Sequence, residues 1–471
     1  MIRKTKIIAT IGPSTSSKDK LRLLIQKGVN VCRLNFSHLD HNKAKEIISN
    51  IKEVNQELNV HTAILADLQG PKIRVGDFEK PIKLKKGAEV LFCTKKKKNT
   101  IFINYKGFAK DVKKKDKALL DDGKIVLEVV STNNKDMVVL KVLYGGILQS
   151  RKGVNLPNTV ISLPCLTKKD KQDLDFILTQ NIEWVGLSFV RKSKDVKDLK
   201  KIINSRNSLH KVIAKIEKPE AIKNINAIIK VSDAVMVARG DLGVEVPHQK
   251  VPAFQKMIVN RCIKNSTPVI IATQMLESMT ETPTATRAEV NDVANSVIDG
   301  ADALMLSGET SIGKYPLKAV DTMRKIIRDI EASDHSISKK TEIIELEEEG
   351  RFLTNAICLN ATNIAKQTKT KAIITITYSG FNTIKVSSFR PNAFIYAFTN
   401  NHTILNTLSL VWGVQGFYYE GASTTSETIN ETKNMLKKQK FLRKGDLVVN
   451  IASMPAREKG TTNMMKISKI K

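Results

Sequence analysis

Two short groups of charged residues carry the clearest chemical signal in this chain. They are Lys215-Ile216-Glu217 and Arg239-Gly240-Asp241, and each directly follows a short apolar run. A buried strand that ends in charged residues delivers those charges to the rim of a sheet. Two carboxylates beside a lysine and an arginine can hold a divalent cation and neutralise a multiply charged anion at one place. This combination suits phosphoryl or enolate chemistry.

The same residues also have a purely structural interpretation. Glu217 and Asp241 could be surface ion-pair partners, and Lys215 could be one solvated lysine among many. Their position at the ends of apolar runs favours the chemical interpretation for the two carboxylates. For Lys215 alone a solvated lysine is the simpler interpretation, and only the motif that contains it can favour a chemical role.

The elements that would position these residues are eight short apolar runs, each of which ends in a polar group. Amphipathic stretches typical of helices separate most of them. Continuous apolar strands that alternate with helices indicate parallel strands buried on both faces. Eight such strands close a β/α barrel, whose chemistry lies at the C-terminal ends of the strands. The runs are residues 7–9, 29–32, 63–66, 184–187, 212–214, 234–238, 269–272 and 303–306.

The series of runs is interrupted between the third and the fourth. Residues from about 71 to 160 alternate between apolar and polar without helical periodicity, as in 138–143, and turn signals such as Asp121-Asp122-Gly123 punctuate them. The pattern predicts a small, mostly antiparallel β domain inserted after the third strand. An insertion at this place can close over the mouth of the barrel as a lid.

A further segment follows the acidic linker 345–350. Its apolar runs are residues 372–376, 393–397, 416–419 and 447–451, and helical stretches separate them. These runs predict a separate α/β domain with an open sheet, for regulation or assembly. We therefore predict an α/β chain: a (β/α)8 TIM barrel over 1–70 and 161–342, an inserted small β-barrel lid domain over 71–160, and a C-terminal α/β domain over 343–471.

Composition limits the functional classes. The chain has 471 residues and a formal net charge of +30, but its lysines are spread along the whole length and its aromatic content is only 5%. Nucleic-acid binding is the alternative that such a charge raises, and few aromatics argue against it. No run is long and apolar enough to span a bilayer. The five cysteines are scattered, which is typical of thiols in a reducing cytoplasm.

Ten ordered motifs make the chain closely similar to the pyruvate kinase family over nearly its whole length. Motifs at these positions and in this order are very specific to that family. They are Ala9-Thr10-Ile11-Gly12-Pro13-Ser14, Arg33-Leu34-Asn35-Phe36-Ser37-His38, Gly70-Pro71-Lys72-Ile73-Arg74, Lys152-Gly153-Val154-Asn155-Leu156-Pro157, Leu187-Ser188-Phe189-Val190-Arg191, Lys215-Ile216-Glu217, Arg239-Gly240-Asp241-Leu242-Gly243, Ala272-Thr273-Gln274-Met275-Leu276-Glu277, Thr284-Ala285-Thr286-Arg287-Ala288-Glu289 and Met305-Leu306-Ser307-Gly308-Glu309-Thr310.

The resemblance implies transfer of the phosphoryl group of phosphoenolpyruvate to ADP, giving pyruvate and ATP. It implies that Glu217 and Asp241 hold Mg²⁺ or Mn²⁺, hard cations that prefer carboxylate oxygens. It implies that Lys215 spreads the charge of the transferring group, and that Thr273 orients or relays a proton, together with Ser307, near the enolate carbon. The implied catalytic residues are Lys215, Arg33, Thr273 and Ser307, and the implied substrate-binding residues are Arg33, Ser188, Lys215, Gly240, Asp241 and Thr273.

The resemblance also implies a nucleotide side and an assembly. The nucleotide-side positions are Pro13, Asn35, His38, Arg74, Lys152, Asn155 and, from the lid, Asp122. For Arg74 a structural ion pair is an alternative, and for Asp122 a simple turn. Members of the family are usually cytoplasmic homotetramers, so we expect that assembly here, with no nucleic-acid or membrane partner.

The chain departs from the usual family pattern at the monovalent-cation site. Asn35, Ser37, Asp67 and Leu68 match the positions of the K⁺ site, but Lys72 stands where most members have a glutamate. A tethered ammonium repels a second cation close by. We therefore expect that activity does not depend on K⁺. The alternative role of Asn35, Ser37 and Asp67 is to order Arg33 and Lys72.

A second departure lies in the C-terminal domain. The loop 377–383 matches a loop that cradles a sugar phosphate in some relatives, but Tyr378 and Phe381 replace the basic residues common there. Regulation by fructose 1,6-bisphosphate is therefore not expected, and another phosphorylated effector or none remains. Two rival functions are an aldolase or synthase acting on phosphoenolpyruvate, which would lack the lid and the C-terminal domain, and a basic RNA-binding protein.

Overall fold

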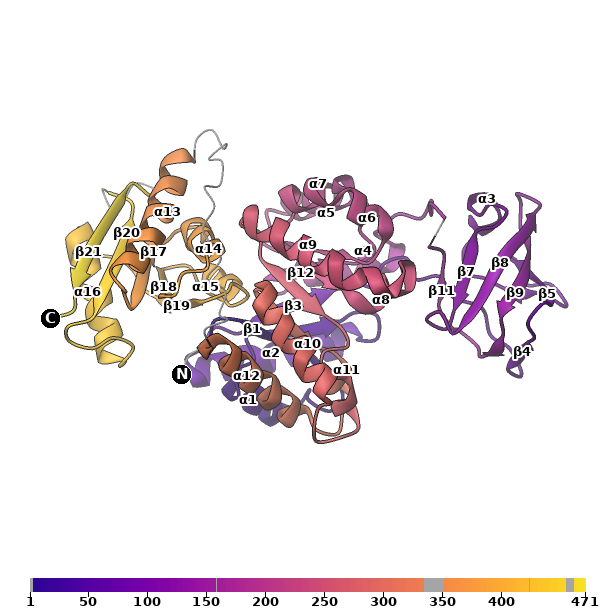
Figure 1. Ribbon diagram of the computed structural model, residues 1–471, viewed down its shortest axis with the longest axis horizontal. Helices are drawn as coiled ribbons and strands as arrows, with labels where there is room; N and C mark the ends of the chain where they lie inside the picture. Colours follow the sequence, from indigo (N-terminus) through magenta and orange to yellow (C-terminus); the bar gives the residue numbers. More distant parts are fainter. Residues whose placement is uncertain (1–2, 158, 334–350, 423, 455–460) are drawn as a thin grey trace.

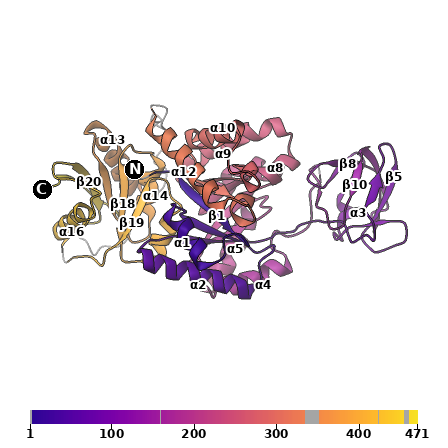
Figure 2. The same cartoon turned by 90° about the horizontal axis from the view of Figure 1, so that it is seen from below.

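The computed structural model describes residues 3–157, 159–333, 351–422, 424–454 and 461–471. Figure 1 shows three bodies in a row, with a barrel in the middle, a β-rich lid at one end and an α/β domain at the other. Figure 2, a view at right angles, shows the same order. The acidic linker 345–350 and the predicted boundary at 342/343 lie outside the described residues.

The central body is a closed barrel of eight parallel strands, as the apolar runs predict. Going around the barrel, the order is β1-β16-β15-β14-β13-β12-β3-β2. The strands are β1 (Lys6–Ile11), β2 (Val31–Asn35), β3 (Ala63–Asp67), β12 (Trp184–Leu187), β13 (Lys211–Ile216), β14 (Ala234–Ala238), β15 (Val269–Ala272) and β16 (Ala303–Leu306). Seven of the eight predicted runs overlap their strands at nearly every residue, and the run 29–32 begins two residues before β2.

Helices between the strands cover the outside of the barrel. Their apolar faces pack against strand residues such as Ile7, Leu34 and Val212 in one large core. Polar residues fix where several of them begin: Asp40, Thr167 and Thr286 each accept a backbone N–H of the first turn of the helix that follows. They are α1 (Lys18–Gln26), α2 (His41–Leu58), α4 (Lys168–Ile177), α5 (Ser193–Ser205), α6 (Pro219–Lys223), α7 (Ile225–Val231), α8 (Arg239–Glu245), α9 (Val251–Lys264), α10 (Arg287–Asp299), α11 (Gly308–Ser311) and α12 (Pro316–Ala332).

The lid is inserted between β3 and α4, as predicted, and its strands pair mostly antiparallel. A six-stranded sheet has the order β11-β7-β8-β9-β5-β6, and β10 pairs with β4. Its apolar residues form a core of their own, with Phe92, Tyr105 and Phe108 fully buried. The elements are β4 (Ile82–Leu84), β5 (Glu89–Cys93), β6 (Ile101–Phe102), α3 (Phe108–Asp111), β7 (Lys117–Leu120), β8 (Ile125–Thr132), β9 (Met137–Tyr144), β10 (Gly146–Leu148) and β11 (Val154–Asn155).

The C-terminal body is an open sheet in the order β19-β18-β17-β20-β21. Four strands are parallel and match the predicted runs, whereas the antiparallel edge strand β21 was not predicted. The elements are α13 (Phe352–Gln367), β17 (Ala372–Ile376), α14 (Phe381–Ser388), β18 (Phe394–Thr399), α15 (His402–Leu408), β19 (Val414–Tyr418), α16 (Thr425–Lys438), β20 (Leu447–Ala452) and β21 (Met464–Lys469).

This body closes the N-terminal end of the barrel. Leu410 belongs to the same buried cluster as the inward-facing strand residues Ile8, Val31 and Trp184. Arg390 pairs with the buried Asp302 at 2.8 Å, and the Lys6 ammonium donates to the Val414 carbonyl at 2.6 Å. The C-terminal ends of the barrel strands are therefore the ends left for chemistry. Among the described residues, none of the helices is both long and apolar enough to span a bilayer.

Candidate active site

The C-terminal ends of β2, β3, β12 and β13 bring a network of buried charges together. The Lys215 ammonium lies 3.1 Å from Asp67 Oδ1 and 3.0 Å from Glu217 Oε1, and it donates to the Ser188 hydroxyl at 2.7 Å. Arg33 donates to Asp67 Oδ2 from Nε at 2.8 Å, and its Nη2 lies 2.6 Å from the same oxygen. Four charged residues and one serine, from four different strand ends, are therefore joined in one network.

Burial excludes the solvent-exposed alternative for Lys215 and Glu217. Lys215 is only 8% exposed and Glu217 only 1%, so Lys215 is not a solvated lysine and Glu217 is not a surface ion-pair partner. Placing such charges away from water is costly, and proteins keep them only with partners. The arrangement is typical of a functional site.

The charge of each group follows from its neighbours. Burial opposes ionisation of Lys215, but the carboxylates of Asp67 and Glu217 outweigh it and raise its pKa. Burial also opposes the charge of Asp67, and the cations of Lys215 and Arg33 outweigh it, so its pKa is lowered. In Glu217, burial raises the pKa, Lys215 counteracts this, and the negative charge of Asp241 adds to it.

Backbone geometry next to this network provides hydrogen-bond donors. Asp241 lies in the first turn of α8, directly after β14, as predicted. The Gly240 N–H donates to the Thr273 hydroxyl at 2.7 Å, and that hydroxyl donates to the Ala272 carbonyl at 2.6 Å. Thr273 therefore already uses its only proton, which agrees with a role in orientation or relay and not as a lone donor.

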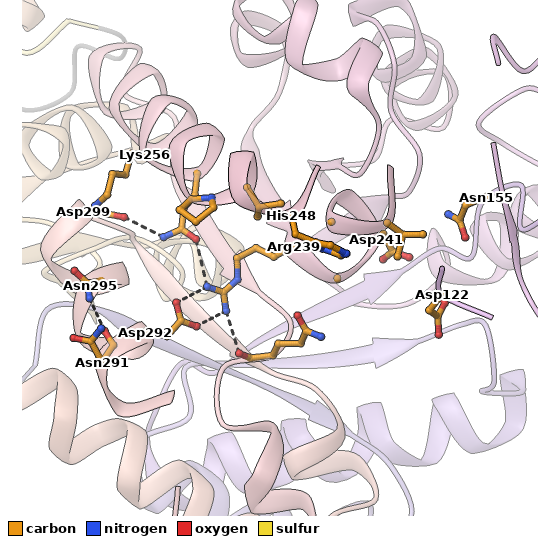
Figure 3. Close-up of a pocket in the computed structure, with 17 residues that line it drawn as sticks. Asp122, Asn155, Arg239, Asp241, His248, Lys256, Asn291, Asp292, Asn295 and Asp299 are labelled. Atoms are coloured by element: carbon orange, nitrogen blue, oxygen red, sulfur yellow. Dashed lines mark hydrogen bonds and ion pairs between the residues drawn. The ribbon is translucent and has the colours of Figure 1, made fainter. Parts of the chain in front are cut away.

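A cavity of about 710 Å³ opens beside α8 and runs between α9 and α10. Figure 3 shows Asp241 on its wall, with Asp122 and Asn155 of the lid across from it. Arg239 donates to both oxygens of Asp292, at 2.6 and 2.7 Å, and to the Thr273 carbonyl at 2.8 Å. Arg239 thus fixes the start of α8 against the loop that carries Thr273. The sequence pattern suggested that this arginine could help to neutralise an anion, whereas its guanidinium is here paired with Asp292.

The lid residues expected on the nucleotide side mostly contact other residues of the lid in this structure. The Arg74 guanidinium donates to the Arg151 carbonyl at 2.8 Å, and the Lys152 ammonium pairs with Asp121 at 2.8 Å, so both contacts lie within the lid. Asp122 lies in a turn with a left-handed φ of 57°, as its alternative interpretation held. Only Asn155 of these lid residues bonds to the barrel, through its amide to Glu245 Oε1 at 2.8 Å.

The remaining predicted residues lie around the same mouth. Asn35 accepts the Ser37 N–H at 3.1 Å, which orders the loop after β2, and Pro13 and His38 are exposed. Leu68 is buried, and its carbonyl accepts the Ser188 hydroxyl at 2.8 Å. Lys72 is exposed, whereas Asp67 forms its ion pairs with Arg33 and Lys215. Asp67 therefore does order Arg33, and the second cation on its carboxylate is Lys215 instead of Lys72.

A second cavity, of about 850 Å³, lies in the C-terminal body at the loop 377–383. The Thr377 hydroxyl accepts the Gly380 N–H at 2.9 Å, which fixes the turn before α14. Phe381 lines this cavity, and the Arg351 guanidinium lies 4.1 Å from the centre of its ring. The predicted effector loop therefore does border a cavity. A cation therefore does lie against the loop, but it comes from Arg351, directly before α13, and not from the loop itself.

Two family models match this chain. One, described as pyruvate kinase, barrel domain, matches residues 2–320, and the other, described as pyruvate kinase, alpha/beta domain, matches residues 355–468. A pyruvate kinase of Geobacillus stearothermophilus is 41% identical over 476 residues, which is 99% of this chain and 80% of that protein. Pyruvate kinase 2 of a Synechocystis species is 43% identical over 477 residues, with 100% and 80% covered.

Solved structures give the same result. A crystal structure of a pyruvate kinase from Cryptosporidium parvum superposes with a TM-score of 0.92 at 34% identity, covering 100% of this chain and 96% of that one. Such agreement over the full length includes the barrel, the lid and the C-terminal body together. The chain spans about four fifths of the length of the two bacterial relatives.

Proposed function

This chain belongs to the pyruvate kinase family, and from that premise we propose which of its residues carry the reaction. It is a phosphotransferase that moves the phosphoryl group of phosphoenolpyruvate to ADP, giving pyruvate and ATP, as in the last step of glycolysis. An aldolase or synthase acting on the same substrate is set aside, because the match extends through the lid and the C-terminal domain.

The central proposal concerns Lys215 and Arg33. Both cations stand at the rim of the barrel, and Asp67 holds each of them in a fixed orientation. A preorganised cation stabilises charge that develops in the transition state without reorganising at the moment of reaction. Lys215 would face the phosphoryl group in transit, and Arg33 would bind its oxygens with a planar fork of donors. The observation that carries this proposal is the shared, buried contact of Lys215 with Asp67 and Glu217.

Glu217 and Asp241 are suitable residues for holding Mg²⁺ or Mn²⁺. Burial and, to a lesser extent, the negative charge of Asp241 raise the pKa of Glu217, so its charged form depends on a nearby cation such as Lys215, 3.0 Å away. A divalent cation would also favour the charged form of both carboxyl groups, and carboxylate oxygens are its preferred ligands. When bound, the ion supplies charge neutralisation for the anionic substrate. We also propose that the start of α8, where Gly240 and Asp241 lie, meets the substrate carboxylate; the Gly240 N–H would then have to leave the Thr273 hydroxyl, to which it donates in this structure.

The bonds that change are few. The P–O bond to the enol oxygen breaks, a P–O bond to the β-phosphate of ADP forms, and the enolate that remains takes a proton at its terminal carbon. The Ser188 hydroxyl orients the Lys215 ammonium by accepting a hydrogen bond from it. Thr273 and Ser307, which follow the neighbouring strands β15 and β16, are proposed to orient or relay the proton.

We propose that Pro13, Asn35, His38, Arg74, Lys152, Asn155 and Asp122 form the nucleotide side. We also propose the domain boundaries: the barrel over 1–70 and 161–342, the lid over 71–160 and the C-terminal domain over 343–471. Each of the three bodies has a large apolar cluster of its own, which supports this division. Closure of the lid would bring Arg74 and Lys152 toward the barrel, where they can neutralise phosphates and exclude water.

We also propose a cytoplasmic location and assembly as a homotetramer. The five buried free thiols support the cytoplasmic location.

The test of the central proposal is Lys215→Met. Its expected result is loss of ATP formation from phosphoenolpyruvate and ADP by about a thousandfold or more, because no other group replaces the ammonium at the moving phosphoryl group. Binding of Mn²⁺, followed by its electron-spin resonance signal, should persist because Glu217 and Asp241 remain. Lys211→Met, at the opposite end of β13, is the control and should stay active. Activity retained in Lys215→Met would contradict the proposal.

We further propose that activity does not require K⁺. In this chain the Asp67 carboxylate is already neutralised by Arg33 and Lys215, so it offers little charge to a monovalent cation. Lys72 adds a positive charge in the same segment. Initial rates measured with K⁺, and with a large inert cation at equal ionic strength, should agree within about twofold. The variant Lys72→Glu is the comparison, and its rate is expected to drop about tenfold when K⁺ is left out. The same drop in the unmodified chain would contradict the proposal.

A further inference from the structure

One buried carboxylate ties together the two strand ends that carry hydroxyl groups. Glu309 is fully buried, with an exposed fraction of 0%. Its Oε2 accepts the backbone N–H of Ser307 at 2.6 Å, and its Oε1 accepts the backbone N–H of Leu276 at 3.0 Å. One side chain therefore bridges the segment after β16 and the segment after β15.

Both segments have an unusual backbone. Thr273 and Gln274 have left-handed φ angles of 70° and 54°, although neither is glycine. Ser307 has φ −110° and ψ −95°, outside the helical and extended regions. Such conformations cost on the order of 1–3 kcal/mol each and persist only where surrounding contacts enforce them. The two hydrogen bonds of Glu309 are contacts of this kind: one holds Leu276, three residues after Thr273, and the other holds Ser307 itself.

We infer that Glu309 is a positioning residue for the protonation half of the reaction, setting the Thr273 hydroxyl and the Ser307 hydroxyl relative to each other. The inference rests on the proposed roles of those two hydroxyls. In this structure the Thr273 hydroxyl donates to the Ala272 carbonyl and accepts from the Gly240 N–H. It must turn away from Ala272 to pass a proton, and the nearest strand end that carries another proposed relay hydroxyl is that of β16, with Ser307, because β16 pairs with β15.

The chemical step balances without a proton from Glu309. After the phosphoryl group has left, the enolate electron pair returns to form the C=O bond, and the terminal carbon takes a proton to become the methyl group. The hydroxyl that gives this proton regains one from its neighbour, and solvent water supplies the net proton. Glu309 only accepts hydrogen bonds, and a carboxylate suits this because each of two N–H donors needs its own acceptor oxygen. An amide has one acceptor oxygen and would turn an NH₂ group toward the second N–H.

The decisive experiment compares proton transfer with phosphoryl transfer in Glu309→Gln. Proton transfer is measured as deuterium uptake into the methyl group of pyruvate in D₂O with ATP and Mg²⁺, followed by NMR, and phosphoryl transfer as ATP formation in the forward direction. We expect methyl exchange to fall by about tenfold or more, and ATP formation by about threefold or less. Equal falls in both rates, or unchanged exchange, would overturn the inference.

Two further variants keep the test sharp. Glu289 is the matched control, because its carboxylate also accepts two backbone N–H groups, those of Ser278 and Thr286, in the same β15–α10 connection. Glu289→Gln should lower the melting temperature but leave the ratio of exchange to ATP formation unchanged. Glu309→Asp keeps the carboxylate but is one CH₂ shorter, and it replaces Glu309→Gln in the experiment if that variant does not fold. The same fall in the ratio of methyl exchange to ATP formation is expected. An unmodified chain that makes no ATP would contradict the function itself, independently of Glu309.

Discussion

At the scale of single residues, the site depends on one aspartate more than its sequence position suggested. The sequence places Asp67 after the third apolar run and at a monovalent-cation position, yet its two oxygens hold the two cations of the site, Arg33 and Lys215. Asp67 itself is 1% exposed. The pKa of Lys215 is raised despite burial because Asp67 and Glu217 favour its charged form. Asp67 is therefore the counter-charge that makes a buried, positively charged site possible.

Asp67→Asn tests this role. Removing one partner of a buried ion pair leaves uncompensated charge, so we expect a loss of about 3–5 kcal/mol in the free energy of unfolding. We also expect kcat to fall by about a hundredfold, because an amide neither fixes nor neutralises both cations. Urea unfolding and initial rates per folded molecule measure the two effects.

The control for that variant lies at the other end of the barrel. Asp302 is 2% exposed and pairs with Arg390, so Asp302→Asn removes a comparable buried charge far from the reacting groups. It should lose similar stability and keep its rate per folded molecule. If both variants lost activity in proportion to their stability, Asp67 would have no special role in the site.

At the scale of elements, the barrel was predictable because its strands are buried on both faces and therefore read as continuous apolar runs. The polar residue after each run marked the C-terminal rim, and Lys215, Glu217 and Asp241 do lie there. The alternating pattern of the lid was predictable for the same kind of reason, since one face of each strand is solvated. The edge strand β21 escaped prediction because Met464–Lys469 carries little apolar pattern.

Contacts between elements could not be predicted. Nothing in the local pattern indicates that Leu410 enters the inner core of the barrel, or that Asn155 donates to Glu245 in α8. Glu309 illustrates the same limit. Its motif was recognised, but its bond to Leu276 joins residues 33 positions apart and depends on the packing of two neighbouring loops. Local pattern specifies which elements form and which rim carries charge, whereas long-range packing decides which charges meet.

At the scale of the whole molecule, the barrel and the C-terminal domain share buried polar contacts. Glu183, just before β12, is 5% exposed, and its two oxygens accept the Ile64 N–H and the Asn406 amide, each at 2.8 Å. Ile64 belongs to the barrel and Asn406 to α15 of the C-terminal domain. Burial raises the pKa of Glu183 to about 7, although the hydrogen bonds from Asn406 and Ile64 act in the opposite direction. This junction therefore titrates near neutral pH.

The sign of the resulting pH dependence follows from linkage. The pKa of Glu183 is about 7 in the folded chain and 4.5 as the ordinary value of the side chain, so the folded state binds the proton more tightly. Its contribution to stability is full below pH 4.5 and is lost as the pH rises through 7. Glu183→Gln cannot ionise and should escape this loss. Relative to the unmodified chain, its stability should rise by up to roughly 3 kcal/mol between pH 5 and pH 8.

Melting temperatures of both proteins at several pH values across this range measure the difference. Glu46→Gln, on the exposed face of α2, is the control, and its melting temperature should run parallel to that of the unmodified chain. A constant difference between Glu183→Gln and the unmodified chain would mean that Glu183 does not change its charge in this range. A difference that grows with pH would mean that ionisation of Glu183 weakens the junction between the barrel and the C-terminal domain. This junction lies at the N-terminal end of the barrel strands, opposite the reacting groups.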